Sequence, residues 1–231
     1  MTTVLSCVVE LAGLPGSGKT TLATALRERL LADGIPCTVA DHGVSAHAAK
    51  HARMARRTGY ALRELTAAPA ATTRSTRVLV GSVQEAHRDA AAVLAQWLAT
   101  EHLAARGRGR PGVQLLEEGL VQATWTAMLR ARDLRPEALW ECLPPEAHTD
   151  LVLFVDVHPE LAASRLAARL SKHSRTQRLN PAARIHELRR GQAVLDEVLT
   201  SCPLRVVHLT TAGEEVEDVA EQAYQAVLSL R

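Results

Sequence analysis

Short apolar runs alternate with amphipathic stretches along the chain. Val4–Leu11 is an apolar run rich in valine, and in the following stretch Leu22, Leu26 and Leu30 recur every four residues. An apolar run of this length is typical of a strand buried in a parallel sheet, and the four-residue spacing is typical of one helical face. Strands alternating with helices predict an α/β fold, with a five-stranded parallel sheet covered by helices on both faces. The other predicted strands are Ile35–Ala40, Val113–Leu116, Leu151–Val157 and Arg205–Leu209.

The same pattern predicts the helices that flank these strands. They span Lys19–Ala32, a long segment that begins near Val83, Pro159–Leu170, Pro181–Leu199 with Asn180 as its cap, and Val216–Leu230. Arginine and glycine alternate from Arg106 to Arg110, and Pro111 and Gly112 follow, which predicts a mobile loop at 106–112. We find no internal repeat and no linker, so residues 1–231 are predicted to form one domain.

The segment from about 42 to 81 has no clean period, but it is strongly basic. It lies where a second substrate would approach, so we expect a helical region on the acceptor side of a site. Its charges are either a basic surface or a means of holding an anionic acceptor. It carries one acid, Glu64, against seven cations: Lys50, Arg53, Arg56, Arg57, Arg63, Arg74 and Arg77.

Composition excludes several classes of protein. A net charge of +2 and a pI near 8.5 are too mild for a typical nucleic-acid-binding protein. The four cysteines form no CxxC pair, which favours a reducing compartment over a zinc site or a disulfide framework. No segment has the roughly 20 apolar residues of a membrane span, and no cleavable leader is evident. We therefore expect a cytoplasmic protein without nucleic-acid or membrane partners, and a homodimer is possible.

One motif carries the functional argument. The segment from Gly13 to Thr20 fits G-x-x-x-x-G-K-[ST] at every fixed position, between a predicted strand and a predicted helix. Glycines allow backbone N–H groups to face phosphate oxygens, lysine reaches the β- and γ-phosphates, and threonine ligates Mg²⁺. The sequence thus predicts an ATP and Mg²⁺ site formed by Gly13, Pro15, Gly16, Ser17, Gly18, Lys19, Thr20 and Thr21.

Three carboxylates are candidates for the chemistry beside this loop. Glu117 and Glu118 follow the third predicted strand, at the sheet edge where ligands bind in open α/β folds. We expect Glu117 to hold Mg²⁺ together with Thr20, and Glu118 to face the acceptor or an arginine. The sequence supports the reverse assignment of the two glutamates almost equally well. Asp41 follows the second strand and is either a general base for an acceptor hydroxyl or a helix cap.

Cations that neutralise the transferred phosphoryl group are predicted after the fourth strand. Arg165 and Arg169 lie four residues apart on one helical face, and a polar, basic segment follows them. This arrangement predicts a lid at about 169–181, in which both arginines take part in catalysis; the alternative is a solvated basic face.

With these motifs in place, the chain resembles the nucleotide and nucleoside kinase group of P-loop proteins. Residues 151–160, followed by Ala163, Arg165 and Arg169, are similar to the fourth strand and lid entry of thymidylate kinases. That resemblance implies ATP–Mg²⁺ as donor and an adenine site near Thr210–Gly213. Pro15 stands where thymidylate kinases carry an acid, and the loop is closer to kinases of small hydroxylated molecules, including antibiotic phosphotransferases.

Two functions remain open from the sequence. The first is a kinase that transfers the γ-phosphoryl group of ATP to a nucleoside, a nucleotide or a hydroxylated natural product, with Lys19, Asp41, Glu118, Arg165 and Arg169 as catalytic residues. The second is an ATPase or regulatory NTP-binding protein in which Glu118 activates water.

Overall fold

The structure is a computed structural model that describes residues 5–40, 50–82, 87–169 and 176–230. Its helices and strands follow one another as β1 (Ser6–Ala12), α1 (Lys19–Ala32), β2 (Cys37–Ala40), α2 (Lys50–Ala67), α3 (Pro69–Gly81), α4 (His87–Arg108), β3 (Gly112–Leu116), α5 (Leu120–Met128), α6 (Pro136–Trp140), η1 (Pro145–Ala147), β4 (Leu151–Asp156), α7 (Pro159–Ala168), η2 (Thr176–Arg178), α8 (Pro181–Thr200), β5 (Val206–Thr210) and α9 (Val216–Leu228).

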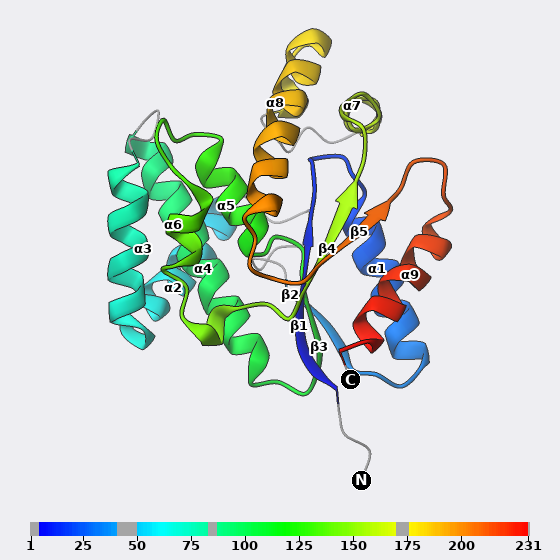
Figure 1. Cartoon of the computed structure of the whole chain (residues 1–231), viewed down its shortest axis with the longest axis horizontal. Coiled ribbons are helices and arrows are strands. Elements are labelled where there is room, and N and C mark those ends of the chain that lie inside the picture. The colour runs from blue at the N-terminus through cyan, green and yellow to red at the C-terminus, as the bar shows by residue number, and fades with distance from the viewer. Residues whose placement is uncertain (1–4, 41–49, 83–86, 170–175, 231) are drawn as a thin grey trace.

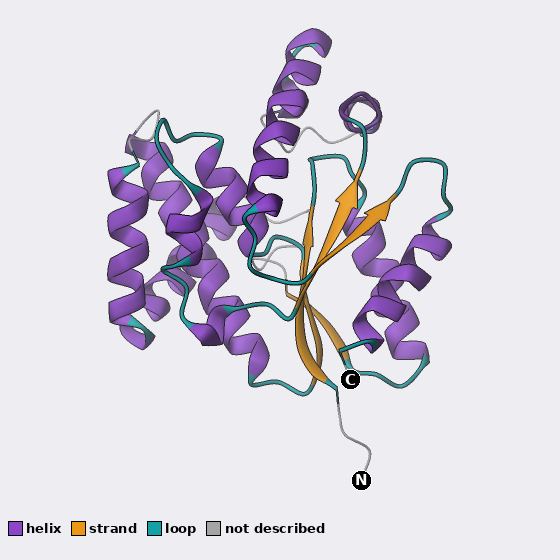
Figure 2. Cartoon of the chain, viewed as in Figure 1, coloured by secondary structure: helices purple, strands orange, loops and turns teal. Residues whose placement is uncertain are grey.

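The five strands form one parallel sheet in the order β2-β3-β1-β4-β5. The predicted α/β fold, with its five-stranded parallel sheet and helices on both faces, is confirmed (Figure 2). Strand β1 is central, so the loop that follows it lies beside the ends of β3 and β4. Because all five strands run the same way, the carboxyl ends of β1, β2 and β3 lie at one edge of the sheet.

Alternate residues of the strands build two cores. On one face, Val9 and Leu11 of β1 pack with Leu22 and Leu26 of α1 and with α9. On the other face, Ala12 packs with α4, α5, α7 and α8. Helices α2, α3 and α6 form a further layer outside α4, on the left of Figure 1. In the described ranges, no helix combines the length and the apolar composition of a membrane span.

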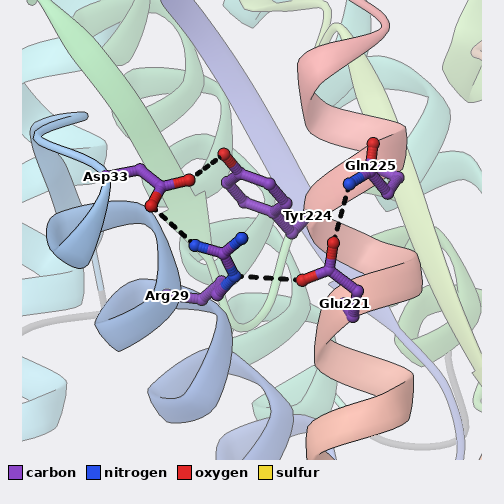
Figure 3. A network of polar contacts seen from close by, with 5 residues as sticks. All are labelled: Arg29, Asp33, Glu221, Tyr224 and Gln225. Atoms are coloured by element: carbon purple, nitrogen blue, oxygen red, sulfur yellow. Dashed lines mark hydrogen bonds and ion pairs between the residues drawn. The ribbon is translucent and has the colours of Figure 1, made fainter.

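A polar network joins α1 to α9 (Figure 3). The Arg29 guanidinium lies 4.2 Å from the centre of the Tyr224 ring and binds Asp33 at 2.7 Å and Glu221 at 3.0 Å. The Tyr224 hydroxyl donates to Asp33, and Gln225 donates to Glu221 at 2.7 Å. The network therefore ties the helix that follows the P-loop to the last helix of the domain.

One expectation from the sequence is corrected. The predicted loop at 106–112 is helical as far as Arg108, because Gly107 lets α4 approach Val8 and Gln114 closely. The segment at about 42–81 was expected to be helical, and where it is described it forms the two helices α2 and α3. Residues 42–49 of that region, residues 170–175 of the predicted lid, and Asp41 lie outside the described residues.

Candidate active site

The P-loop turns sharply between β1 and α1, and packing explains two of its glycines. Gly13 and Gly16 have φ values of 150° and 92°. A Cβ at Gly13 would lie 2.6 Å from the carbonyl oxygen of Val155, and one at Gly16 would lie 2.6 Å from that of Ala162. The loop therefore rests directly on the backbone of the β4–α7 segment, and side chains at these positions would displace it.

Lys19 begins α1 and folds back over the loop. Its Nζ donates to the carbonyl oxygens of Gly13 at 2.7 Å and Leu14 at 3.0 Å. Burial, together with the charge of Arg169, lowers the pKa of Lys19 to about 8, while Glu118 and Glu117 oppose the shift. A poorly solvated ammonium group that is held by two carbonyls is well placed to exchange them for phosphate oxygens.

The two residues predicted to hold Mg²⁺ are in direct contact. The Thr20 hydroxyl donates to Glu117 Oε2 at 3.1 Å, across the gap between the P-loop and the turn after β3. Hydroxyl and carboxylate oxygens are the ligands that Mg²⁺ prefers, together with phosphate oxygens and water. Among the described residues, no group of three or more His, Cys, Asp or Glu side chains could hold a metal alone. The donor set thus fits a metal that is bound together with nucleotide.

Glu118 points to the helical layer instead. Its Oε2 accepts from Arg57 Nη2 of α2 at 2.9 Å. The adjacent glutamates therefore have different surroundings, Glu117 beside the P-loop and Glu118 beside an arginine of the acceptor-side region. The chemical roles predicted for the two glutamates stay predictions.

The two predicted lid arginines have different surroundings. Arg169, which ends α7, lines a pocket beside the P-loop. Arg165 instead donates through Nη1 to the Ser17 carbonyl at 3.1 Å and to Thr211 Oγ1 at 2.9 Å, and through Nη2 to the Thr211 carbonyl at 2.8 Å. Arg165 thus joins the P-loop to the segment after β5, outside the pocket that the described residues line. The catalytic roles predicted for Arg165 and Arg169 stay predictions.

The remaining predicted nucleotide-binding residues surround this loop. Pro15, Gly16, Gly18, Lys19 and Thr20 line the pocket. Ser17 is fully buried and Thr21 is exposed. The base of the predicted lid is anchored, because Gln177 donates to the carbonyl of Leu166 at 3.2 Å.

The pocket has a volume of about 410 Å³ and extends from the P-loop across the sheet edge to α5 and α8. Gln96, Gln122 and Trp125 are at most 9% exposed. The Trp125 indole donates to the Gly191 carbonyl at 2.7 Å, so the ring forms a fixed wall. The residues that line the pocket beyond the P-loop are Arg57, Gln96, Glu117, Glu118, Gln122, Trp125, Thr126, Leu129, Arg130, Arg169, Thr176, Glu187, Leu188 and Arg190.

Several of these residues are not predicted from the sequence. Gln96, Gln122 and Arg190 lie on helices whose periodic pattern identifies only the apolar face, and Arg130 lies in the turn after α5. Glu10 is a different case, because it is a fully buried carboxylate within an otherwise apolar strand, and that interruption is itself a signal. Burial raises the pKa of Glu10 to about 7, although hydrogen bonds from the backbone of Val121 and Leu120 oppose the shift.

Comparison with known proteins agrees with this geometry. The family model of adenylylsulphate kinase matches residues 5–52, which include β1, the P-loop, α1 and β2. None of the curated proteins compared with the chain gives a match. The P-loop, the sheet and the family match together identify the chain as a P-loop kinase, a phosphotransferase that uses ATP. The match ends within α2, before most of the pocket, and the resemblances to thymidylate kinases and antibiotic phosphotransferases stay predictions.

Proposed function

We propose that this kinase transfers the γ-phosphoryl group of ATP, with Mg²⁺, to a nucleoside, a nucleotide or a hydroxylated natural product. The continuity of the pocket carries this proposal. Lys19 and Thr20 line one end of it, and Trp125, Thr126 and Arg190 line the same cavity beyond the P-loop. Hydrolysis needs room for one water molecule, whereas a phosphotransferase must hold a second substrate in line with the γ-phosphate.

The chemistry of the far end supports a polar acceptor. Arg57, Arg130 and Arg190 bring guanidinium groups to the wall, and Gln96 and Gln122 bring nearly buried amides. Guanidinium groups suit phosphate or carboxylate, and amides suit hydroxyl groups and the polar atoms of a ring. An acceptor with several hydroxyl groups, with or without a phosphate, meets this set of partners.

On the donor side, the P-loop N–H groups and Lys19 would hold the β- and γ-phosphates, and Arg169 would approach them from the end of α7. Thr20 and Glu117 would hold Mg²⁺, which when bound neutralises charge on the phosphate oxygens. Arg165 would fix the loop that carries Ser17 by its contacts with Thr211. In this proposal most of these groups bind the magnesium nucleotide, whereas Arg165 orients the P-loop.

Asp41 is our proposed general base. Asp41→Asn should lower phosphoryl transfer by at least about 100-fold and leave ATP affinity within about twofold, since general-base catalysis contributes about 10²–10⁴ in rate. Equal losses of transfer and of ATP affinity, or no loss of transfer, would assign the base elsewhere.

The alternative is an ATPase in which Glu118 activates water. The ion pair between Glu118 and Arg57 favours the kinase, because that carboxylate already accepts from a cation on the acceptor side. The deciding experiment measures ATP turnover alone and with a panel of nucleosides, nucleoside monophosphates and aminoglycosides, and follows the phosphorylated acceptor by mass spectrometry. We expect turnover to depend on one acceptor class; brisk hydrolysis alone, with no phosphorylated acceptor, would favour the ATPase.

A further inference from the structure

Glu10 places a carboxylate inside the sheet, next to the turn that carries the acidic residues. It is fully buried, and it pairs with Leu116 at the last position of the β1–β3 register. The chain leaves β3 immediately afterwards, as Glu117, Glu118 and Gly119. Beyond this pair, no further position of the two strands is in register, so other contacts must fix the turn.

The carboxylate supplies such contacts. Glu10 Oε2 accepts from the Leu120 N–H at 2.6 Å, and Oε1 accepts from the Val121 N–H at 3.0 Å. These N–H groups belong to the first turn of α5, where no backbone carbonyl of the helix can accept from them. The N-cap residue is Gly119, so the helix has no side-chain cap of its own. A negative charge also suits the positive end of the helix. Glu10 therefore caps α5 from the neighbouring strand.

Two features show how closely the turn is fitted to Glu10. A Cβ at position 119 would collide with the Glu10 carboxylate, so the turn closes over this group only with glycine there. In the next residues, Gln122 Oε1 accepts from the Gly13 N–H at 3.3 Å. The first turn of α5 is thus bound both to β1 and to the first residue of the P-loop.

We propose that Glu10 is a positioning residue for the magnesium nucleotide: it holds the turn after β3 so that Glu117 lies within reach of Thr20. The contact between Glu117 and Thr20, at 3.1 Å, joins segments that follow two different strands. Without the contacts between Glu10 and α5, the position of the turn relative to the sheet is not fixed. Thr20 and Glu117 are then no longer held where both can bind the same Mg²⁺. The inference rests on the proposed roles of Thr20 and Glu117.

The test compares Glu10→Gln with wild type by calorimetric titration of ATP at about pH 8, in excess Mg²⁺ and in EDTA. Glutamine retains the size of the side chain, but its amide places an NH₂ donor opposite one of the two N–H groups. We expect ATP affinity in EDTA to stay within about twofold, and the gain in affinity due to Mg²⁺ to fall about 10-fold or more, in the range seen when partners of metal ligands are removed.

Glu101→Gln is the matched control. Glu101 is also fully buried, but it lies on α4 and accepts from Ser75 and Trp97, away from the P-loop. Glu101→Gln should show the same gain in ATP affinity on addition of Mg²⁺ as the wild type. If Glu10→Gln does not fold, as judged by its melting transition, Glu10→Asp serves instead: it keeps the charge but shortens the reach by one methylene, and the same selective loss is expected.

The outcomes separate this inference from the proposed function. An equal loss of affinity with and without Mg²⁺ would show that Glu10 supports the fold alone, and an unchanged gain would show that it is dispensable; each overturns the inference while the ATP site stands. Failure of the wild-type protein to bind ATP would overturn the proposed function itself. Wild-type binding without any Mg²⁺ gain would remove the roles of Thr20 and Glu117, and this inference with them.

Discussion

The guanidinium of Arg165 binds both the side chain and the main chain of Thr211, through Nη1 to Oγ1 at 2.9 Å and through Nη2 to the carbonyl at 2.8 Å. Both residues also bind the carbonyl oxygen of Ser17, Arg165 at 3.1 Å and Thr211 at 3.1 Å. Three segments that are distant in the sequence therefore meet at one P-loop carbonyl. This junction makes Arg165 a residue that orients the loop.

Arg165→Ala should weaken ATP binding roughly 10-fold, because hydrogen bonds to a charged group contribute about 1.5–3 kcal/mol each and the P-loop loses its anchor. Thr211→Val should give a smaller loss, and the double variant should lose less than the sum, since both changes break one junction. Calorimetric titration with ATP measures this. Arg189→Ala, at an exposed ion pair with Glu160, is the control; strictly additive losses at Arg165 and Thr211 would contradict the coupling.

Arg57→Met should impair use of the acceptor selectively. The change removes the partner of Glu118 and one cation of the pocket wall. We expect kcat/KM for the acceptor to fall by about 10-fold or more, equivalent to about 1.4 kcal/mol or more, with ATP affinity nearly unchanged. Steady-state kinetics with the acceptor found in the panel, compared with Arg63→Met on the same helix, provides the measurement. A matching drop in ATP affinity would place Arg57 on the donor side.

Stability should fall as the pH rises through about 7, and Glu101 should cause part of this. Burial raises the pKa of Glu101 from 4.5 to about 7. The folded state then holds a proton that the unfolded state has already released, so its contribution is complete below about pH 4.5 and is lost as the pH approaches and passes 7.

Glu101→Gln should remove that contribution to the pH dependence. Glutamine keeps an acceptor for Ser75 and Trp97 but carries no charge, so the variant should melt close to wild type at pH 5 and at a higher temperature at pH 8. Thermal melts across this range test the idea, with the exposed Glu137→Gln as control. Parallel profiles for wild type and Glu101→Gln would refute it.

Tyr224→Phe should lower the free energy of unfolding by about 1 kcal/mol. The hydroxyl donates to Asp33 within the α1–α9 network of Figure 3, and a phenylalanine ring still packs under Arg29. Chemical denaturation should register this loss, while Gln225→Ala, which removes only an exposed hydrogen bond, should leave stability nearly unchanged. No difference between the two variants would mean that the hydroxyl bond contributes nothing net.

The local sequence pattern was sufficient to predict the parallel sheet and the P-loop. Strands such as Leu151–Asp156 are buried along almost their whole length, so their composition identifies them, and the backbone geometry of the P-loop depends on glycines within a few residues of one another. The placement of Glu117 and Glu118 followed from strand direction, because parallel strands end at one edge. The long helix was predicted but its end was placed too early, since α4 continues through Gly107 to Arg108 despite the low helix propensity of glycine. A Cβ at position 107 would lie 2.9 Å from Val8, so packing favours glycine there.

The sequence by itself determined the fold class and the donor chemistry of this protein, because both arise from periodicity and from a contiguous motif. Only the tertiary structure joined Arg165 to Thr211, paired Glu118 with Arg57, and brought Glu10 beneath the turn at Gly119. Those relationships depend on the strand order and on helix packing across large sequence separations. Residue spacing does not specify such contacts, so the pocket beyond the P-loop is defined by packing, whereas the P-loop itself can be recognised in the sequence.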